Sequence, residues 1–214
     1  MLKIRTFVCN MLQENCYVVS DETGECVIID CGAFYEEERR AIVDYIQGNS
    51  LQLKHLLCTH GHLDHNFGNN TIYETFALAP EVSEGDAKML RHLERQAESF
   101  YGMQLNYEMP RIGKILSEEE PVTFGTHTWK VIATPGHSRG SVCFYDEEEH
   151  VLFSGDTLFH CSIGRTDFEG GSMLQIIQSL RMLAQLPDET TVYSGHGPMT
   201  TIGDELRMNP YMDR

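Results

Sequence analysis

One short run of histidines constrains this chain of 214 residues more than any other feature. Three imidazoles and one carboxylate fall within six positions, in the run Thr59-His60-Gly61-His62-Leu63-Asp64-His65. Neighbouring imidazoles that take up protons together repel one another, so packing does not explain such a cluster. Neutral imidazole is a ligand of zinc and iron, and a carboxylate adds an oxygen ligand. The run therefore predicts a metal site.

The residues around this run place it at the end of a strand. Residues 53–58 are largely apolar and predict a buried strand. Gly61 suits a tight loop, and the segment from Asp64 can open a helix. Functional residues concentrate on loops of this kind, because the rigid elements on either side hold them in place.

The apolar pattern predicts the same order of elements in both halves of the chain, namely strands and then a helix. Predicted strands cover residues 2–8, 15–20, 25–30, 53–58, 77–79, 121–124, 127–133, 141–145, 150–153 and 191–193. Predicted helices cover residues 36–47, 66–76, 84–100 and 172–185. The order predicts an α/β (α+β) chain in which two sheets pack face to face with helices outside. We expect one domain over residues 1–214, with an irregular segment at 101–120 that either covers the site or packs as a surface loop.

Three more polar residues occupy the same kind of position as the histidine run. His137, Asp156 and His196 each follow an apolar strand and each adjoin a glycine. If the sheets align, all these loops meet at one edge. The seven candidate ligands are then His60, His62, Asp64, His65, His137, Asp156 and His196. Because one zinc ion takes about four ligands, seven suit two ions that share a carboxylate.

The charge and the cysteines narrow the functional class. The chain carries 32 acidic and 16 basic residues, a net charge of −16, which argues against nucleic acid and anionic membranes as partners. No apolar run approaches the length of a membrane span. The seven cysteines are scattered, odd in number and without CxxC spacing, so we expect free thiols and a cytoplasmic location.

These motifs strongly resemble those of the metallo-β-lactamase superfamily, over nearly the whole chain. The family's T-H-x-H-x-D-H run matches residues 59–65, and its later ligands match Pro-Gly-His137-Ser, Ser-Gly-Asp156-Thr and Ser-Gly-His196-Gly. The resemblance implies the four-layer αβ/βα sandwich with two mixed sheets and outer helices. It implies that Asp156 bridges two metal ions and that Asp30 supports the site from behind the ligands. The first ion would have His60, His62 and His137, and the second Asp64, His65 and His196.

Within the superfamily the chain resembles the short glyoxalase II type, the hydroxyacylglutathione hydrolases. Residues 156–171 and 195–203 carry this resemblance. It implies hydrolysis of a small-molecule thioester such as S-lactoylglutathione, with Asp64 and Asp156 at the catalytic centre. Two divalent ions, zinc first and iron or manganese as substitutes, would activate a bridging water as hydroxide. The chain ends 18 residues after His196, so we expect no C-terminal glutathione-binding helical domain.

Other interpretations stay open on the sequence alone. A persulfide dioxygenase of the same fold would bind one iron through His60, His137 and Asp156, and a non-catalytic metal-binding module is a third reading. Arg165 is a candidate anchor for a substrate carboxylate, or else the partner of Asp167. Tyr101 and Tyr107 are weaker candidates for the pocket wall. The remaining histidines considered, which we expect to be structural or on the surface, are His55, His92, His127 and His150. The sequence is compatible with either a monomer or a homodimer.

Overall fold

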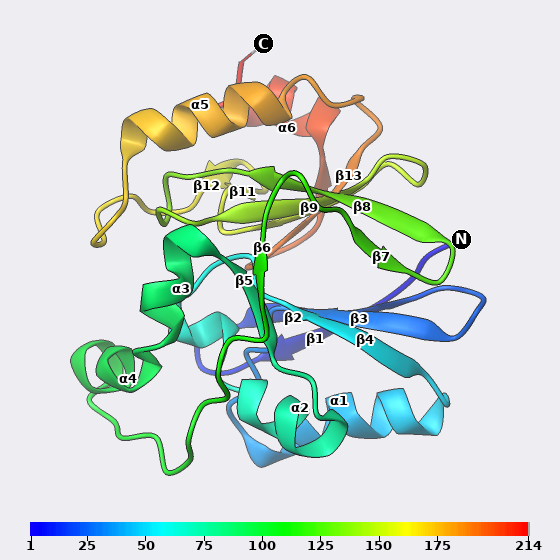
Figure 1. The fold of residues 1–214 in the computed structure, drawn as a ribbon. Coiled ribbons are helices and arrows are strands. Elements are labelled where there is room, and N and C mark those ends of the chain that lie inside the picture. The colour runs from blue at the N-terminus through cyan, green and yellow to red at the C-terminus, as the bar shows by residue number, and fades with distance from the viewer. Residues whose placement is uncertain (214) are drawn as a thin grey trace.

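Two six-stranded mixed sheets lie face to face in the computed structural model of this protein, which describes residues 1–213 (Figure 1). The strands of the first sheet follow in chain order: β1 (Lys3–Cys9), β2 (Glu14–Ser20), β3 (Glu25–Ile29), β4 (Gln52–Leu57), β5 (Pro80–Ser83) and β6 (Lys114–Leu116). β1 to β3 form an antiparallel meander, and β3 to β6 are parallel.

The second sheet has the order β14-β13-β10-β9-β8-β7, and only the pair β10 and β13 is parallel. Its strands are β7 (Val122–Phe124), β8 (His127–Ala133), β9 (Val142–Asp146), β10 (Val151–Gly155), β13 (Thr191–Ser194) and β14 (Thr200–Thr201). A separate small hairpin joins β11 (Leu158–Phe159) to β12 (Ser162–Ile163).

Helices cover the outer face of each sheet (Figure 1). α1 (Glu36–Gly48) and α2 (Asn69–Phe76) lie on the first sheet, and α5 (Met173–Leu183) and α6 (Ile202–Met208) lie on the second. α3 (Glu84–Leu90) and α4 (Leu93–Tyr101) stand beside the site edge of the first sheet. The predicted four-layer class is thereby confirmed. Across residues 1–213, no helix is long and apolar enough to cross a membrane.

The central strands are apolar on both faces because each face meets a different layer. In β3, Val27 and Ile29 join the core between the sheets, whereas Cys26 and Ile28 pack under α1 and α2. Alternation along a strand sends neighbouring side chains to opposite faces. The unbroken apolar run of this strand is therefore the expected pattern for a sheet that is covered on both sides.

Several predicted boundaries were wrong where tertiary contacts override the local pattern. The strand predicted at 77–79 lies at Pro80–Ser83. The helix predicted at 66–76 is a 3-10 turn at Leu63–His65 followed by α2. The helix predicted at 84–100 breaks at His92, whose backbone is not helical, and Leu90 and Leu93 on either side enter one core. The segment 101–120, predicted irregular, contains the edge strand β6.

Parallel strands bring the predicted loops to one edge of the molecule. In the first sheet, β3, β4 and β5 run parallel; β3 and β4 lead to Asp30 and the histidine run, and β5 leads into α3, which carries Asp86. In the second sheet, β8, β10 and β13 share one direction and lead to His137, Asp156 and His196. The carboxyl ends of these strands from the two sheets therefore face each other across the site.

Candidate metal centre

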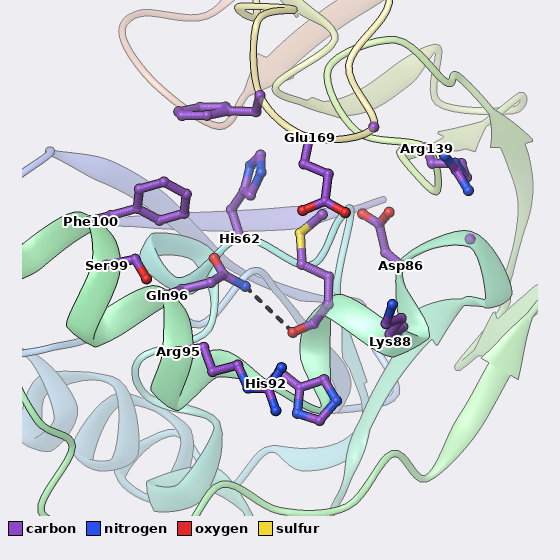
Figure 2. Close-up of a pocket in the computed structure, with 14 residues that line it drawn as sticks. His62, Asp86, Lys88, His92, Arg95, Gln96, Ser99, Phe100, Arg139 and Glu169 are labelled. Atoms are coloured by element: carbon purple, nitrogen blue, oxygen red, sulfur yellow. Dashed lines mark hydrogen bonds between the residues drawn. The ribbon is translucent and has the colours of Figure 1, made fainter.

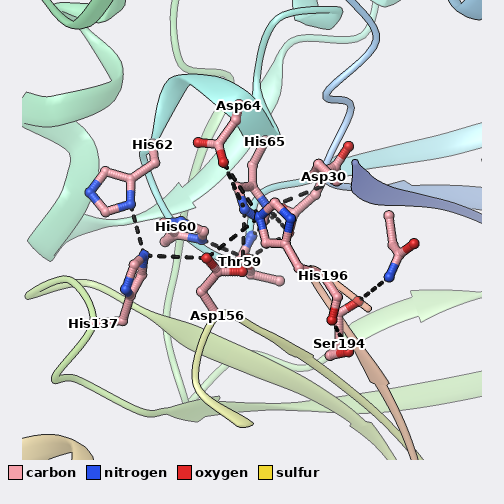
Figure 3. A network of polar contacts seen from close by, with 12 residues as sticks. Asp30, Thr59, His60, His62, Asp64, His65, His137, Asp156, Ser194 and His196 are labelled. Carbon is pink, nitrogen blue, oxygen red and sulfur yellow. Dashed lines mark hydrogen bonds and ion pairs between the residues drawn. The ribbon is translucent and has the colours of Figure 1, made fainter. Parts of the chain in front are cut away.

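The structure brings all seven predicted ligands together at this edge, six of them in two groups of three and Asp156 between the groups (Figure 3). In the first group, one nitrogen each of His60, His62 and His137 lies within 4.8 Å of the other two. His62 Nδ1 and His137 Nε2 are 2.9 Å apart. All three side chains are buried, so their nitrogens meet in a small space that bulk water does not fill.

The second group joins Asp64, His65 and His196, whose ligand atoms also lie within 4.8 Å of one another. Asp64 Oδ2 is 3.7 Å from His65 Nε2 and 3.4 Å from His196 Nε2. His65 is fully buried, whereas His196 is partly exposed at the rim.

Asp156 lies between the two groups. Its Oδ2 is 3.5 Å from His137 Nε2 in the first group and 3.7 Å from His196 Nε2 in the second. Its Oδ1 is 3.3 Å from His65 Nε2. This is the placement that a carboxylate shared between two ions requires.

Buried polar atoms without partners indicate that the site is built for cations. His60 Nε2, His65 Nε2 and Asp156 Oδ1 are buried and make no hydrogen bond within the described chain, although the last two lie 3.3 Å apart as an ion pair. Leaving such an atom unsatisfied costs about 1–3 kcal/mol. Three of them facing one centre, all of ligand type, fit divalent metal ions.

In His60, His65 and His137, a hydrogen bond on the far side of the ring fixes which nitrogen faces the centre. His65 Nδ1 lies 2.9 Å from Asp30 Oδ2, and His137 Nδ1 lies 2.8 Å from the carbonyl oxygen of Arg165. His60 Nδ1 lies 3.0 Å from the hydroxyl of Thr59. Partners of this kind orient metal-binding histidines and set their tautomer.

When no metal is bound, burial and neighbouring charges shift the pKa values of the candidate ligands in opposite directions. Burial, with the neighbouring imidazoles, lowers the pKa of His60 well below its usual range, and burial with His137 lowers the pKa of His62 to about 4. Burial also opposes the charge on His65, but Asp156 and Asp64 outweigh it and raise the pKa of that imidazole. The same pairing lowers the pKa of Asp156 against the effect of burial. His60 and His62 are therefore neutral, whereas His65 and Asp156 form an ionic pair.

Asp86 and Gln96 hold the histidine loop and were missed by sequence analysis. Asp86 accepts hydrogen bonds from the Gly61 N–H, the Ser138 hydroxyl and the Gly140 N–H, so it joins the loops that carry His62 and His137. Gln96 accepts from the Leu63 N–H and donates to the Gly61 carbonyl. Polar residues on helices α3 and α4 look like surface residues in sequence, so no local signal marked them.

Glu14 is a second missed residue, and it lies behind the ligands. The carboxyl group is fully buried, 3.9 Å from His65 Nδ1, and neither oxygen has a hydrogen-bond partner in the described chain. Burial raises the pKa of Glu14 well above its usual range. A single glutamate between two predicted strands gives no sequence signal for such a position.

A cavity of about 370 Å³ opens beside His62 (Figure 2). Phe168 lies on its wall with its ring centroid 5.2 Å from that of His62, and Phe100 lies 5.5 Å from Phe168. Helices α3 and α4 supply most of the remaining wall. No residue of 101–120 lines this cavity, although Tyr101 is close enough to Asp64 for that carboxylate, after burial, to help raise its pKa.

Arg165 is paired outside this cavity. Its guanidinium makes two bonds of 2.7 Å to Asp167 and lies 4.0 Å from the ring centroid of Phe168. The pairing with Asp167 was the alternative reading of the sequence. Tyr107 donates to the Phe67 carbonyl instead of entering the cavity.

Three of the four histidines expected to be structural or on the surface have local partners, whereas His150 Nδ1 is buried without a hydrogen-bond partner in residues 1–213. His55 lies 2.7 Å from Glu81, and His127 lies 2.7 Å from Asp146. His92 lies 3.5 Å from Glu94 and also reaches the cavity wall. None of them belongs to the two ligand groups.

Comparison with known proteins agrees with this geometry. A family model described as the metallo-beta-lactamase superfamily matches residues 9–196. Hydroxyacylglutathione hydrolase GloC from Haemophilus influenzae is 35% identical over 209 residues, which cover 94% of this chain and 93% of that protein.

Solved structures share the fold over nearly the whole chain. BLEG-1 B3 metallo-beta-lactamase superposes with a TM-score of 0.89 at 34% identity and covers 99% of both chains. TTHA1623 in a di-iron-bound form has a TM-score of 0.86 at 34% identity, covering 97% of this chain and 100% of that one. ETHE1 from Myxococcus xanthus has a TM-score of 0.77 at 27% identity, and the match covers 97% of this chain and 83% of that one.

Proposed function

The chain belongs to the metallo-β-lactamase superfamily, and from this premise we propose that it is a binuclear metal-dependent hydrolase of thioesters such as S-lactoylglutathione. The observation that carries the proposal is the position of Asp156 between two complete ligand groups. The similarity to a hydroxyacylglutathione hydrolase over nearly the full length of both chains supports the substrate class. The free cysteines support a reducing, cytoplasmic location.

When bound, two divalent ions, zinc in the first instance, would supply Lewis acidity that activates water and polarises a carbonyl. The residues around them keep their ligand atoms available, because His60 and His62 are held neutral and Asp64 and Asp156 are held ionised. The water oxygen forms a bond with the thioester carbonyl carbon. The carbon–sulfur bond breaks, and sulfur leaves as a thiolate. Asp64 accepts the proton of the water and passes it to solvent.

The basic side chains that line the cavity beside His62 favour an anionic substrate. Lys88, Arg95 and Arg139 line it, and none of the three has a carboxylate partner within residues 1–213. Unpaired cations are notable in a chain with a net charge of −16. Of the acids on the wall, Asp86 is engaged by loop hydrogen bonds, while Glu169 stays exposed. We therefore place the carboxylate-bearing part of the thioester in this cavity.

Release of free thiol from S-lactoylglutathione by the metal-loaded protein tests the proposal. His62→Ala removes one ligand of the first group, and we expect thiol release to fall at least about a thousandfold. His150→Asn, on the turn between β9 and β10, is the matched histidine control and should retain the activity. A metal-loaded protein that releases no thiol from glutathione esters or other thioesters would overturn the proposal.

A persulfide dioxygenase is the second candidate, supported by the similarity to ETHE1. Two histidines and a carboxylate suit a single iron, and His60, His137 and Asp156 supply such a set. One iron per chain, with oxygen uptake on glutathione persulfide, would favour it. Hydrolysis of a β-lactam in the same series of assays would instead favour the activity named for BLEG-1.

A further inference from the structure

The turn between β11 and β12 and helix α6 bring together another set of metal-ligating side chains. His160, Cys161 and Glu205 each offer one ligand atom, and these atoms lie within 4.8 Å of one another. His160 and Cys161 form the two-residue turn of the hairpin, and Glu205 comes from α6. None of the three belongs to the centre described above.

The spacing of the ligand atoms is close to that of a tetrahedral zinc site. His160 Nδ1 lies 3.3 Å from Glu205 Oε1 and 3.9 Å from Cys161 Sγ. Zinc takes nitrogen and oxygen at about 2.0–2.1 Å and sulfur at about 2.3 Å, which places tetrahedral ligands roughly 3.3–3.6 Å apart. The third separation, from Cys161 Sγ to the Glu205 carboxylate, is also within 4.8 Å.

Glu205 provides a fixed, buried anchor for this cluster. Its side chain is fully buried, and it accepts hydrogen bonds from the Thr200 hydroxyl, the Cys161 N–H and the Asn209 amide. Oε1 has two lone pairs, and Thr200 uses one of them. Within residues 1–213, His160 is the only ion-pair partner of this carboxylate.

Cys161 differs from the other cysteines in its access to solvent. Six of the seven are buried, whereas Cys161 is partly exposed beside an exposed His160. An ion can therefore reach the thiol without local unfolding. Thiolate, imidazole and carboxylate together form a donor set typical of zinc.

We propose that His160, Cys161 and Glu205 form a third metal site, which binds a divalent ion of the zinc class with solvent completing its coordination. On binding, the Cys161 thiol loses its proton to solvent as the sulfur–metal bond forms, and His160 binds as the neutral imidazole. The ring of Phe159, next to His160, lies 6.1 Å from that of His196. Occupancy of the third site therefore fixes the hairpin beside the second ligand group. This inference does not depend on the reaction that the main centre catalyses.

Titration of the metal-free full chain with Co²⁺ alone tests this site. The main centre has no sulfur ligand, so a sulfur-to-cobalt charge-transfer band in the near ultraviolet reports thiolate coordination. We expect three equivalents and this band in the wild type. Cys161→Ser should lose the band and the third equivalent while keeping two, and His160→Ala should weaken the third site at least tenfold.

Two further variants separate this site from the main centre. His62→Ala disrupts the first ligand group and should keep the charge-transfer band, and His150→Asn should behave as the wild type. Circular dichroism checks that each variant is folded. A wild type that binds only two equivalents without the band, or a band that persists in Cys161→Ser, would overturn the proposal.

Discussion

Asp30 connects the ends of two neighbouring strands to the second ligand group. It accepts hydrogen bonds from the Thr59 N–H at 2.7 Å and the Thr59 hydroxyl at 2.6 Å, and its Oδ2 lies 2.9 Å from His65 Nδ1. Its backbone is left-handed, with φ of 51°, which aspartate tolerates better than most residues. One carboxylate thus sets the orientation of the ring and of the loop.

We predict that Asp30→Asn weakens the metal affinity of the second group by about 10–100-fold, because the amide holds the His65 ring less firmly. Competition with a chelator measures the affinity. Asp44→Asn, an exposed substitution on α1, is the matched control and should change nothing. Equal affinities in a folded Asp30→Asn variant would contradict this role.

Arg139 and Arg165 offer two different anchors for a substrate carboxylate, and kinetics can separate them. Arg139 is unpaired on the cavity wall, whereas Arg165 is engaged by Asp167. A charge-assisted hydrogen bond is worth about 1.5–3 kcal/mol, so Arg139→Ala should raise KM for S-lactoylglutathione by roughly 10–100-fold. Arg165→Ala should change KM less than threefold, as should the control Arg181→Ala on α5. The reverse ranking would restore Arg165 as the anchor.

The seven candidate ligands could be predicted because each lies in a short local pattern at a strand end. Glycine beside them was part of that pattern, and the structure explains why: a Cβ on Gly155 would lie 2.3 Å from Thr59 Oγ1. Glu14, Asp86 and His160 have no such pattern. Their partners come from segments far away in the chain, so only the folded structure brings these groups together.

At the scale of elements, His55 links the two sheets. This residue of β4 lies 2.7 Å from Glu81 in β5 and 3.1 Å from the Thr123 carbonyl in β7. Burial lowers the pKa of His55, but the hydrogen bond to Glu81 outweighs it and raises the pKa above its usual 6.5. The charged imidazole is therefore more stable in the folded than in the unfolded chain.

A raised pKa stabilises the fold fully below the unfolded value and loses its effect as pH rises through the folded value. We predict that His55→Gln lowers the free energy of unfolding by about 1.5–3 kcal/mol at pH 6 and by clearly less at pH 9. Urea unfolding at both pH values measures the difference. A loss that is equal at both pH values would show that His55 acts by packing alone.

The turn between β7 and β8 depends on a close approach that only glycine permits. Gly125 has a φ of 53°, and an added Cβ would lie 2.0 Å from Asp21 Oδ2. Gly24 has a φ of 82° with nothing within 4 Å of an added Cβ. Gly24→Ala should cost about 1–2 kcal/mol of backbone strain, and Gly125→Ala should cost at least about 1 kcal/mol more. Equal losses in thermal unfolding would exclude the contact with Asp21.

The class of the fold could be predicted because both halves repeat the order of strands and helix. Sequence analysis did not predict the break between α3 and α4, nor the edge strands β6 and β14. β6 has three residues and β14 has two, too short for a period to appear. Their pairing partners decide their existence, and those partners are distant in the chain.

At the scale of the whole molecule, negative charge is buried at the edge where both sheets carry the candidate ligands. The chain has a net charge of −16, and Asp30, Asp64 and Asp156 are buried there. Bound cations offset this charge only in the folded state, because folding assembles the ligands from strand ends of both sheets. Metal binding should therefore be a large part of the stability of the protein.

We predict that removing the metal lowers Tm. A ligand that binds only the folded state at a thousand times its Kd adds about 4 kcal/mol, and for a chain of this size 1 kcal/mol corresponds to about 2–4 °C. A chelator should then lower Tm by roughly 8–16 °C, and added metal should restore it. His62→Ala should show a smaller shift, with His150→Asn as the control.

The size of this shift should also depend on pH. Against the effect of burial, the carboxylates raise the pKa of His65 and His196 in the metal-free fold, so both imidazoles take up protons at a higher pH than usual, and a metal ion must displace those protons. Acid therefore weakens metal binding, and the difference in Tm between metal-loaded and metal-free protein should shrink from pH 8 to pH 6. Differential scanning fluorimetry, with metal content checked by elemental analysis, measures it. A Tm that is unchanged on verified removal of the metal would mean that the two sheets hold this edge together without it.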